Sequence, residues 1–397
     1  RRAVLATMIA RDAGKPITMA GAEVDRCITV FRLAAAEAVR FGVEAVPTET
    51  DPRGADYTAR IERFPIGTVA AISPFNFPLN LVAHKVAPAF AAGNPVILKP
   101  PPQAPMAAFE LARILIDCGA PRGALQVLHL PIPVAERLAT DPAFAMLSFT
   151  GSDRVGWHLK SIAGRKRVAL ELGGNAATLV HGDTPDLPAV AARIAVGAFG
   201  YAGQVCIKVQ RLYVHRSIYR AFRSELLTAT RKLKGGDPLA EASVYGPVID
   251  QTAADRISSW VDEAVSGGAE PILRGSRNGL TLRPVILEKA TRDMNVTRRE
   301  IFGPVLTLAP YRDWDEALAL ANDTEYGLQA GIYTRDQGRI EEAFRSLQVG
   351  GVIVNDIPTV LLDHLPYGGV KSSGFGREGV RSAMTEMTEE RVLLSRR

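Results

Sequence analysis

The sequence predicts an α/β protein built around mainly parallel sheets. Between residues 67 and 172, short apolar runs alternate with longer helical segments, which is typical of parallel strands joined by helices. A second region of the same character follows residue 174. The 397 residues exceed the usual size of one domain, and a composition of 47% hydrophobic and 22% charged residues excludes intrinsic disorder. We therefore expect two or three folded domains.

The first half of the chain begins with two helices. Apolar residues recur at helical spacing from residue 4, stop at Gly14-Lys15-Pro16, and recur in a second helix that ends near Gly42. Residues 56–64 alternate polar and apolar side chains, as in a half-buried strand. The remaining predictions are buried strands at 67–72, 95–98, 125–128, 145–149 and 167–172, and helices at 104–118, 134–140 and 155–163.

The second half repeats this alternation without an internal sequence repeat. A long apolar helix is predicted at 187–199, and the segment 386–394 is predicted to be an edge strand that reaches another subunit. The other predicted elements are strands at 211–214, 284–287 and 331–334, and helices at 254–267, 314–322 and 338–347.

Composition excludes several classes of function. The net charge of +5 is scattered, and its densest runs, 165–167 and 231–234, form no basic patch for nucleic acid. No apolar run has the length of a membrane span, and the start, Arg1-Arg2, does not look like a secretory leader. The three cysteines are distant from one another, so neither a disulfide framework nor a metal site is expected, and a reducing, cytoplasmic location is predicted.

Three residues are candidates for chemistry. Cys206 becomes a nucleophile if its surroundings stabilise the thiolate, although a free cysteine is more often a small buried hydrophobe. Glu171 ends an apolar strand before Gly173 and Gly174, where partial burial would suit it to general-base work; the alternative is a solvated carboxylate. Asn76, between two prolines, could donate to an oxyanion or simply occupy a turn.

Two further residues suggest a bound nucleotide. Lys99 directly follows a strand, where it could pair with ribose hydroxyls or phosphate, and an ordinary surface lysine is equally plausible. Ser152 is placed at a helix N-cap, and helix N-termini attract phosphate, although capping alone would explain it. The segment around Ser152, residues 149–156, does not contain the dinucleotide fingerprint Gly-x-Gly-x-x-Gly.

Seven segments taken together resemble the NAD(P)-dependent aldehyde dehydrogenase superfamily. Each is weak alone, but all seven occur in the family's order, which is highly specific. They are Ser-Pro-Phe-Asn-Phe-Pro (73–78), Gly-Asn-Pro-Val-Ile-Leu-Lys-Pro (93–100), Phe-Thr-Gly-Ser (149–152), Glu-Leu-Gly-Gly (171–174), Gly-Gln-Val-Cys (203–206), Glu-Ile-Phe-Gly-Pro-Val (300–305) and Pro-Tyr-Gly-Gly-Val-Lys-Ser-Ser-Gly-Phe-Gly-Arg-Glu-Gly (366–379).

The resemblance implies a mechanism of covalent catalysis. Cys206 attacks an aldehyde, Asn76 and the Cys206 backbone N–H stabilise the oxyanion, hydride passes to the nicotinamide, and Glu171 activates the water that hydrolyses the thioester. Glu378 matches a second glutamate that relays protons, with an exposed helix charge as the equal alternative.

The resemblance also implies the residues that bind the cofactor. Glu300 matches a contact to the nicotinamide ribose, Phe302 packs on the nicotinamide, and Lys99 and Ser152 match adenosine-side positions. Pro102 stands where NAD-preferring members often have a glutamate, and the absence of that carboxylate removes a repulsion against a 2′-phosphate, so NADP is possible. NAD is still slightly favoured. The other cofactor-binding positions are Ile72, Ser73, Phe75, Phe149, Gly151, Val155, Leu172 and Gly173.

The implied architecture has three parts. A Rossmann-like cofactor domain (1–47 and 66–173) precedes an α/β catalytic domain (174–382), and a small oligomerisation element (48–65 and 383–397) pairs subunits into a homodimer or homotetramer. Because the chain opens inside a helical pattern, part of the cofactor domain is expected to precede residue 1.

The substrate is expected to be a small to medium uncharged aldehyde. The sequence looks most like the lactaldehyde, phosphonoacetaldehyde and non-phosphorylating glyceraldehyde-3-phosphate branch, but Val205 and residues 360–362 supply no cation for an anionic substrate. His84 and Lys85 could supply one, and Lys208 could lie at the surface or assist the thiolate. The alternatives are a phosphorylated or phosphonylated aldehyde, a CoA-acylating dehydrogenase, which the presence of Glu171 argues against, and a non-catalytic scaffold of the same fold.

Overall fold

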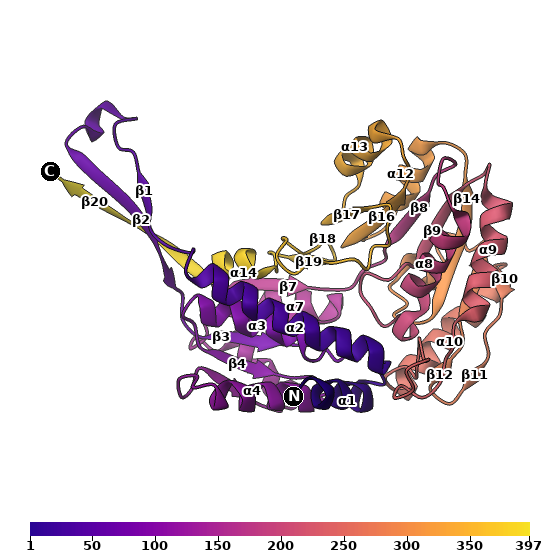
Figure 1. Cartoon of the computed structure of the whole chain (residues 1–397), viewed down its shortest axis with the longest axis horizontal. Helices are drawn as coiled ribbons and strands as arrows, with labels where there is room; N and C mark the ends of the chain where they lie inside the picture. The colour runs from indigo at the N-terminus through magenta and orange to yellow at the C-terminus, as the bar shows by residue number, and fades with distance from the viewer.

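Two sheets flanked by helices form the body of the protein, and a third, narrow sheet projects from it. The structure is a computed structural model that describes residues 1–397. A six-stranded sheet has the order β19-β7-β6-β3-β4-β5, and a seven-stranded sheet has the order β10-β13-β14-β9-β8-β16-β17. The first occupies the lower left of Figure 1 and the second the right. The α/β class predicted from the sequence is therefore confirmed.

The six-stranded sheet carries one side of the site at the carboxyl ends of its strands. Its parallel strands are β3 (Val69–Ile72), β4 (Val96–Lys99), β5 (Leu125–Val127), β6 (Met146–Thr150) and β7 (Arg167–Glu171). They match five of the predicted strands. The short β19 (Gly374–Phe375) comes from much later in the chain and pairs antiparallel with β7.

Helices cover both faces of this sheet. The predicted helices are present as α1 (Arg2–Ala13), α2 (Ile17–Ala38), α4 (Met106–Asp117), α5 (Ile132–Ala135), α6 (Arg137–Thr140) and α7 (Asp153–Ile162). Residues of α1, α2 and α4 share one apolar core with the sheet, and α14 (Val380–Glu386) contributes Met384 to it. The C-terminal region thus returns to the first half of the chain.

Helix α3 (Asn80–Ala91), which begins four residues after Asn76, had no counterpart among the predicted elements. Nine of its twelve residues are buried, so the helix has no polar face and shows no amphipathic period. It also contains Pro88, a residue normally taken as a helix breaker. Because of its full burial and its internal proline, this helix shows none of the sequence patterns from which helices are predicted.

The seven-stranded sheet forms the second unit. Its strands are β8 (Ala177–Val180), β9 (Arg211–His215), β10 (Glu270–Leu273), β13 (Val285–Glu288), β14 (Val305–Tyr311), β16 (Gln329–Tyr333) and β17 (Gly351–Val354), all parallel except β10. The helices of this unit are α8 (Leu187–Phe199), α9 (Tyr219–Lys232), α10 (Gln251–Ser266), α11 (Asn295–Arg298), α12 (Trp314–Asn322) and α13 (Gln337–Ser346). Of these, β8, β10, β14, β17, α9 and α11 had no counterpart among the predicted elements.

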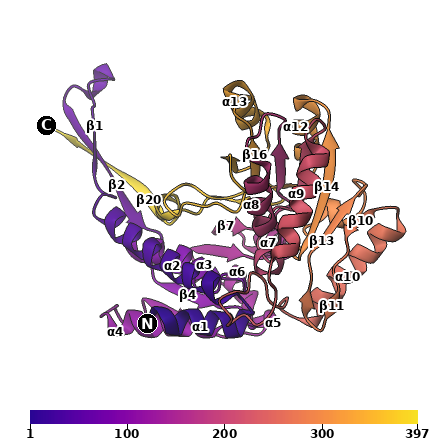
Figure 2. The same cartoon turned by 45° about the vertical axis from the view of Figure 1, so that its right-hand side comes forward.

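The third sheet combines segments from both ends of the chain. Strand β2 (Tyr57–Pro65) pairs antiparallel with β20 (Thr388–Arg396) over nine residues, and β1 (Glu44–Val46) pairs with the other side of β2. Both views show this ribbon extending away from the body (Figures 1 and 2). The predicted edge strand is present, and all of its residues after Thr388 are exposed. Its contact with another subunit and the domain boundaries stay predictions.

No helix combines the length and the apolar character needed to cross a bilayer.

Candidate active site

A cavity of about 440 Å³ receives side chains from both large sheets. Loops at the carboxyl ends of β3, β6 and β7 line one side, and segments that precede β9 and β14 line the other. Ligands of α/β sheets usually bind at this edge. Many of the predicted residues meet there: Phe75, Asn76, Gly151, Ser152, Glu171, Leu172, Gly173, Cys206, Glu300 and Phe302.

Cys206 follows a sharply bent turn. Tyr201, Ala202 and Gly203 all have positive φ, and a Cβ on Gly203 would lie 2.3 Å from the carbonyl oxygen of Gly303. Only glycine fits there, so the turn is determined by close backbone approach. The Cys206 thiol is half-buried, and Sγ lies 3.5 Å from the Tyr367 hydroxyl. Burial raises the pKa of Cys206 to about 12, against the opposing effect of the Tyr367 hydrogen bond.

Asn76 lies beside the nucleophile loop. Its Nδ2 donates to the carbonyl of Gln204, 3.1 Å away, and its buried Oδ1 has no partner. Since an amide nitrogen carries two N–H groups, one remains for a ligand. The side chain therefore bridges the two halves of the cavity near Cys206.

A buried ion pair holds the backbone of Asn76. Lys15 Nζ lies 2.5 Å from Glu23 Oε2 and donates to the Asn76 carbonyl at 2.8 Å. The other oxygen of Glu23 accepts the backbone N–H groups of Leu79 and Asn80, at the start of α3. Lys15 also lies over the Phe77 ring at 3.4 Å, and burial lowers its pKa to about 8. No sequence pattern indicated this pair.

Glu171 and Glu378 form a buried acidic pair. Their exposed fractions are 5% and 3%, so the solvated alternatives considered for both residues are wrong. Burial, followed by the charge of Glu378, raises the pKa of Glu171 well above its usual value. Glu378 accepts a hydrogen bond from Lys85 Nζ at 2.9 Å, and Oε2 of each glutamate lacks a partner. Glu378 itself lies outside the cavity lining.

The other end of the cavity is open and glycine-lined. Glu300 Oε1 accepts the backbone N–H of Gly174 at 3.0 Å, and burial raises the pKa of Glu300 to about 7. A Cβ on Gly173 would lie 2.5 Å from Glu300 Oε2, so a larger residue there would displace the Glu300 carboxylate. Phe75 and Phe302 meet edge-to-face at 5.9 Å. At the N-terminus of α7, Ser152 makes no side-chain capping bond, so its hydroxyl is free of that role.

The remaining predicted residues do not line the cavity. Lys99 is half-buried and donates only to the adjacent Pro100 carbonyl, at 3.4 Å, while Pro102 is exposed. The buried Phe149 ring packs beneath Gly151 and Gly156 instead. Ile72, Ser73 and Val155 likewise lie outside the lining.

Comparison with known proteins agrees with this geometry. The model of the aldehyde dehydrogenase family matches residues 1–393. The chain belongs to the aldehyde dehydrogenase family. It is 45% identical over 395 residues to 3-sulfolactaldehyde dehydrogenase from Priestia aryabhattai, covering 99% of this chain and 83% of that protein.

Two other relatives extend the comparison. Lactaldehyde dehydrogenase from Methanococcus vannielii is 37% identical over 402 residues, covering 99% of this chain and 84% of that protein. The structure of glyceraldehyde-3-phosphate dehydrogenase GapN from Methanocaldococcus jannaschii, complexed with NADP, superposes with a TM-score of 0.95 at 37% identity, covering 100% of this chain and 86% of that one. This aldehyde dehydrogenase is thus an NAD(P)-dependent oxidoreductase.

Several residues that line the cavity of this aldehyde dehydrogenase were not predicted from the sequence. Tyr367 falls inside one of the seven family segments but was not singled out. Arg256 and Trp260 stand one turn apart on α10, with the guanidinium 4.8 Å from the ring centre. Only the fold places that helix beside the cavity. The other missed lining residues are Pro74, Leu81, Thr150, Asp153, Arg299 and Tyr326.

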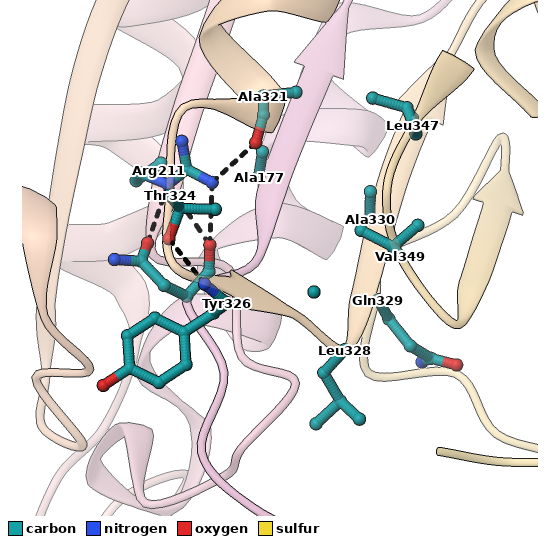
Figure 3. Close-up of a pocket in the computed structure, with 12 residues that line it drawn as sticks. Ala177, Arg211, Ala321, Thr324, Tyr326, Leu328, Gln329, Ala330, Leu347 and Val349 are labelled. Atoms are coloured by element: carbon teal, nitrogen blue, oxygen red, sulfur yellow. Dashed lines mark hydrogen bonds between the residues drawn. The ribbon is translucent and has the colours of Figure 1, made fainter. Parts of the chain in front are cut away.

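A buried arginine, Arg211, holds the end of α12, just before the loop that carries Tyr326. In Figure 3, Arg211 lies next to Thr324 and Ala321. Its guanidinium donates to the carbonyls of Leu320, Ala321 and Asn175. The adjoining pocket has a volume of about 10 Å³, too small for an organic ligand. The Tyr326 hydroxyl donates to Asp153 Oδ2 at 3.0 Å, which ties this loop to α7.

The three cations considered for substrate binding or thiolate activation are buried elsewhere. Lys208 Nζ donates to the Val305 carbonyl at 2.7 Å, so the surface alternative is wrong, and Lys208 does not line the cavity. His84 Nε2 lies 2.9 Å from Asp363 Oδ1, and Lys85 pairs with Glu378. Neither His84 nor Lys85 lines the cavity.

Proposed function

We propose that this aldehyde dehydrogenase oxidises a small 2-hydroxyaldehyde to the 2-hydroxy acid, with Cys206 as nucleophile and Glu171 as general base. The observation that carries the assignment of roles is the shared cavity, in which Cys206, Asn76 and Glu171 converge from two separate sheets. A buried carboxylate of raised pKa is suited to accept a proton near neutral pH.

The first half of the reaction begins with a protonated thiol, because burial holds the pKa of Cys206 near 12. Loss of the thiol proton to Glu171, directly or through water, allows Sγ to bond to the aldehyde carbon. The second N–H of Asn76 and the Cys206 backbone N–H then stabilise the oxyanion. A bound nicotinamide supplies the hydride acceptor for the carbon of this thiohemiacetal. Transfer of hydride leaves a thioester, and Glu171 releases the proton it received from the thiol. In the second half, Glu171 takes a proton from water while the water oxygen attacks the thioester, and the C–S bond breaks to regenerate the Cys206 thiolate.

The open end of the cavity fits a dinucleotide. Gly151 and Gly173 leave room for close approach, and the Glu300 carboxylate is available to accept ribose hydroxyls once ionised. Phe302 and Phe75 supply apolar faces for a planar ring. The N-terminus of α7 at Ser152 offers N–H groups for phosphate. Adenosine-side roles for Lys99 and Pro102 lie beyond this cavity and stay predictions, as does a preference for NAD.

The proposed substrate class rests on what the relatives act on. The substrates named for three of them are sulfolactaldehyde, lactaldehyde and glyceraldehyde-3-phosphate, which share a 2-hydroxypropanal core. They differ at the third carbon. Two arginines, Arg256 and Arg299, line the cavity, but Arg256 lies over the Trp260 ring and Arg299 stands next to Glu300, in the part assigned to the nucleotide. We favour an uncharged group at the third carbon, because Arg26 and His84 both bond to the carboxylate of Asp363. The relatives whose named substrates are anionic support the second candidate, an aldehyde with a sulfonate or phosphate at that carbon.

A matched panel of aldehydes tests the proposal. Lactaldehyde, sulfolactaldehyde, glyceraldehyde-3-phosphate and propanal are compared by kcat/KM, with NAD and NADP in parallel and reduced nicotinamide as readout. We expect Cys206→Ala to abolish turnover and Cys118→Ala, at an exposed cysteine, to leave it intact. Higher kcat/KM for propanal than for every 2-hydroxyaldehyde would contradict the substrate class. Acyl-CoA formed on addition of CoA would support the CoA-acylating alternative.

We also propose that the chain forms a homodimer or homotetramer through the ribbon of β2 and β20. The exposed apolar side chains Val392, Leu393 and Leu394 support this role, because such patches usually mark interfaces. Sedimentation of the protein with and without Leu393→Asp and Leu394→Asp tests it, and an unchanged mass would contradict it. The cytoplasmic location rests on the three free cysteines and stays a prediction.

A further inference from the structure

A buried histidine stands between two carboxylates on the far side of the acidic pair. His84 Nε2 lies 2.9 Å from Asp363 Oδ1, and His84 Nδ1 lies 3.9 Å from Glu378 Oε2. The exposed fraction of the side chain is 2% for His84, 6% for Asp363 and 4% for Glu378. Imidazole can accept a proton at one nitrogen while releasing one from the other, so the ring suits a relay between two carboxylates.

The outer end of this series approaches solvent. Asp363 also accepts a hydrogen bond from Arg26 Nη2, and the Arg26 side chain is 31% exposed. Hydrogen bonds from His84 and Arg26 lower the pKa of Asp363 to about 2, so the carboxylate is ionised at neutral pH. A proton that reaches His84 therefore lies beside a buried anion whose other partner, Arg26, is partly exposed to solvent.

The inner end approaches Glu171. Glu378 Oε2 is buried without a hydrogen-bond partner, whereas its Oε1 is occupied by Lys85. The backbones of Glu378 and Tyr367 pair with each other, and a Cβ on the next residue, Gly368, would lie 2.8 Å from Glu171 Oε1, so the two glutamates stand on neighbouring segments. A movement of about 1 Å would bring His84 Nδ1 from 3.9 Å into hydrogen-bond distance of Glu378 Oε2.

We propose that His84 and Asp363 form the outlet through which protons leave the acidic pair during turnover. The inference rests on the proposed function, in which Glu171 is the base. Oxidation of an aldehyde (RCHO + NAD(P)⁺ + H₂O → RCOO⁻ + NAD(P)H + 2 H⁺) releases two protons. Glu171 takes a proton from water, passes it to Glu378, and regains its charge. Glu378 protonates His84 Nδ1, and the Nε2 proton leaves through Asp363 to water near Arg26.

This outlet serves the stage at which a dinucleotide fills the open end of the cavity. When no dinucleotide is bound, water in that end of the cavity can carry the proton away without the help of any side chain. His84 and Asp363 lie outside the cavity lining, so they can act while the cavity is full. They act through Glu378 and do not touch the substrate.

The experiment isolates hydrolysis of the thioester by using an activated ester. With p-nitrophenyl acetate, Cys206 forms the same kind of thioester and releases p-nitrophenolate in a burst. The slower steady-state release of p-nitrophenolate then reports the rate at which the thioester is hydrolysed. The variant is His84→Gln, measured with and without saturating NADP. His158→Gln is the matched control, because His158 also pairs with a carboxylate, Glu136 at 2.9 Å, but at the surface.

We expect His84→Gln to keep the burst and to slow the steady state on the order of tenfold when NADP is bound, with little change when it is absent. Asp363→Asn should act in the same direction. The solvent isotope effect on the steady state should rise, and imidazole should restore the rate in His84→Gly. An unchanged steady state and isotope effect in folded His84→Gln with NADP bound would overturn the outlet. Loss of the burst in Cys206→Ala tests the nucleophile separately, so the two proposals can fail independently.

Discussion

Replacing Lys15 by methionine tests how the oxyanion side of the cavity is held. Methionine matches the length of the aliphatic part of lysine and removes the charge. Glu23, which is buried with an exposed side-chain fraction of 0%, then loses its only cationic partner, while its bonds to Leu79 and Asn80 remain. Breaking one side of a buried pair typically costs 3–5 kcal/mol, because the other charge is left uncompensated.

The loss should be visible as a shift in unfolding by urea. With a dependence on denaturant of about 3 kcal/mol per molar or somewhat more for a chain of this size, the midpoint should fall by roughly 1 M. The double variant Lys15→Met/Glu23→Gln removes the orphan charge and keeps an oxygen for the two N–H groups of α3. It should recover more than half of the lost stability.

Activity should respond differently from stability. The Asn76 carbonyl loses its 2.8 Å contact with Lys15 in both variants, so the Asn76 amide is less well placed and kcat should stay low in both. Circular dichroism gives the midpoints, and aldehyde turnover gives kcat. The reasoning fails if Lys15→Met unfolds at the native midpoint, or if the double variant regains full kcat together with its stability.

Three more outcomes follow from the site. Because the pKa of Glu300 is about 7, protons compete with ribose hydroxyls, so calorimetry should show NADP affinity rising from pH 6 to pH 8, and Glu300→Gln should remove that rise. Because the pKa of Cys206 is about 12, the rate of its alkylation by iodoacetamide should rise about tenfold per pH unit up to pH 10 without a plateau. The rate should be lower in Tyr367→Phe, which loses the hydrogen bond that lowers this pKa, and the exposed Cys118 serves as the internal reference. Gly203→Ala should abolish kcat because its Cβ would meet Gly303 at 2.3 Å, whereas Gly119→Ala, with open space around it, should cost only about 1–3 kcal/mol of stability and no kcat.

The sequence predicted those parts of the fold that leave a local pattern. The strands that end at Lys99, Thr150 and Glu171 are apolar runs with clear limits, and the structure contains them at nearly the predicted positions. The residues that meet in the cavity were found because they belong to short motifs in a fixed order. Local periodicity and ordered motifs are properties that one chain displays without its fold.

What the sequence did not predict depends on contacts between distant segments. Helix α3 has no polar face because both of its sides are covered, and Lys15 and Glu23 look like ordinary surface charges until the fold buries them. Arg256 reads as one more polar residue of an amphipathic helix. Its place beside the cavity follows from the packing of α10, which no local pattern specifies.

Several buried polar side chains around the cavity share one role, which is to bond to backbone groups near the site. Lys15 bonds the carbonyl of Asn76, Arg211 bonds the carbonyl of Asn175, and Gln210 bonds the carbonyl of Arg299 and the N–H of Ile301, on either side of Glu300. Each holds the backbone at or within two residues of a proposed site residue and leaves the site itself free for ligands. Apolar packing alone fixes volume but not the direction of a peptide group. Burial of these polar groups is therefore explained by the need to orient the backbone where two sheets meet at one reacting carbon.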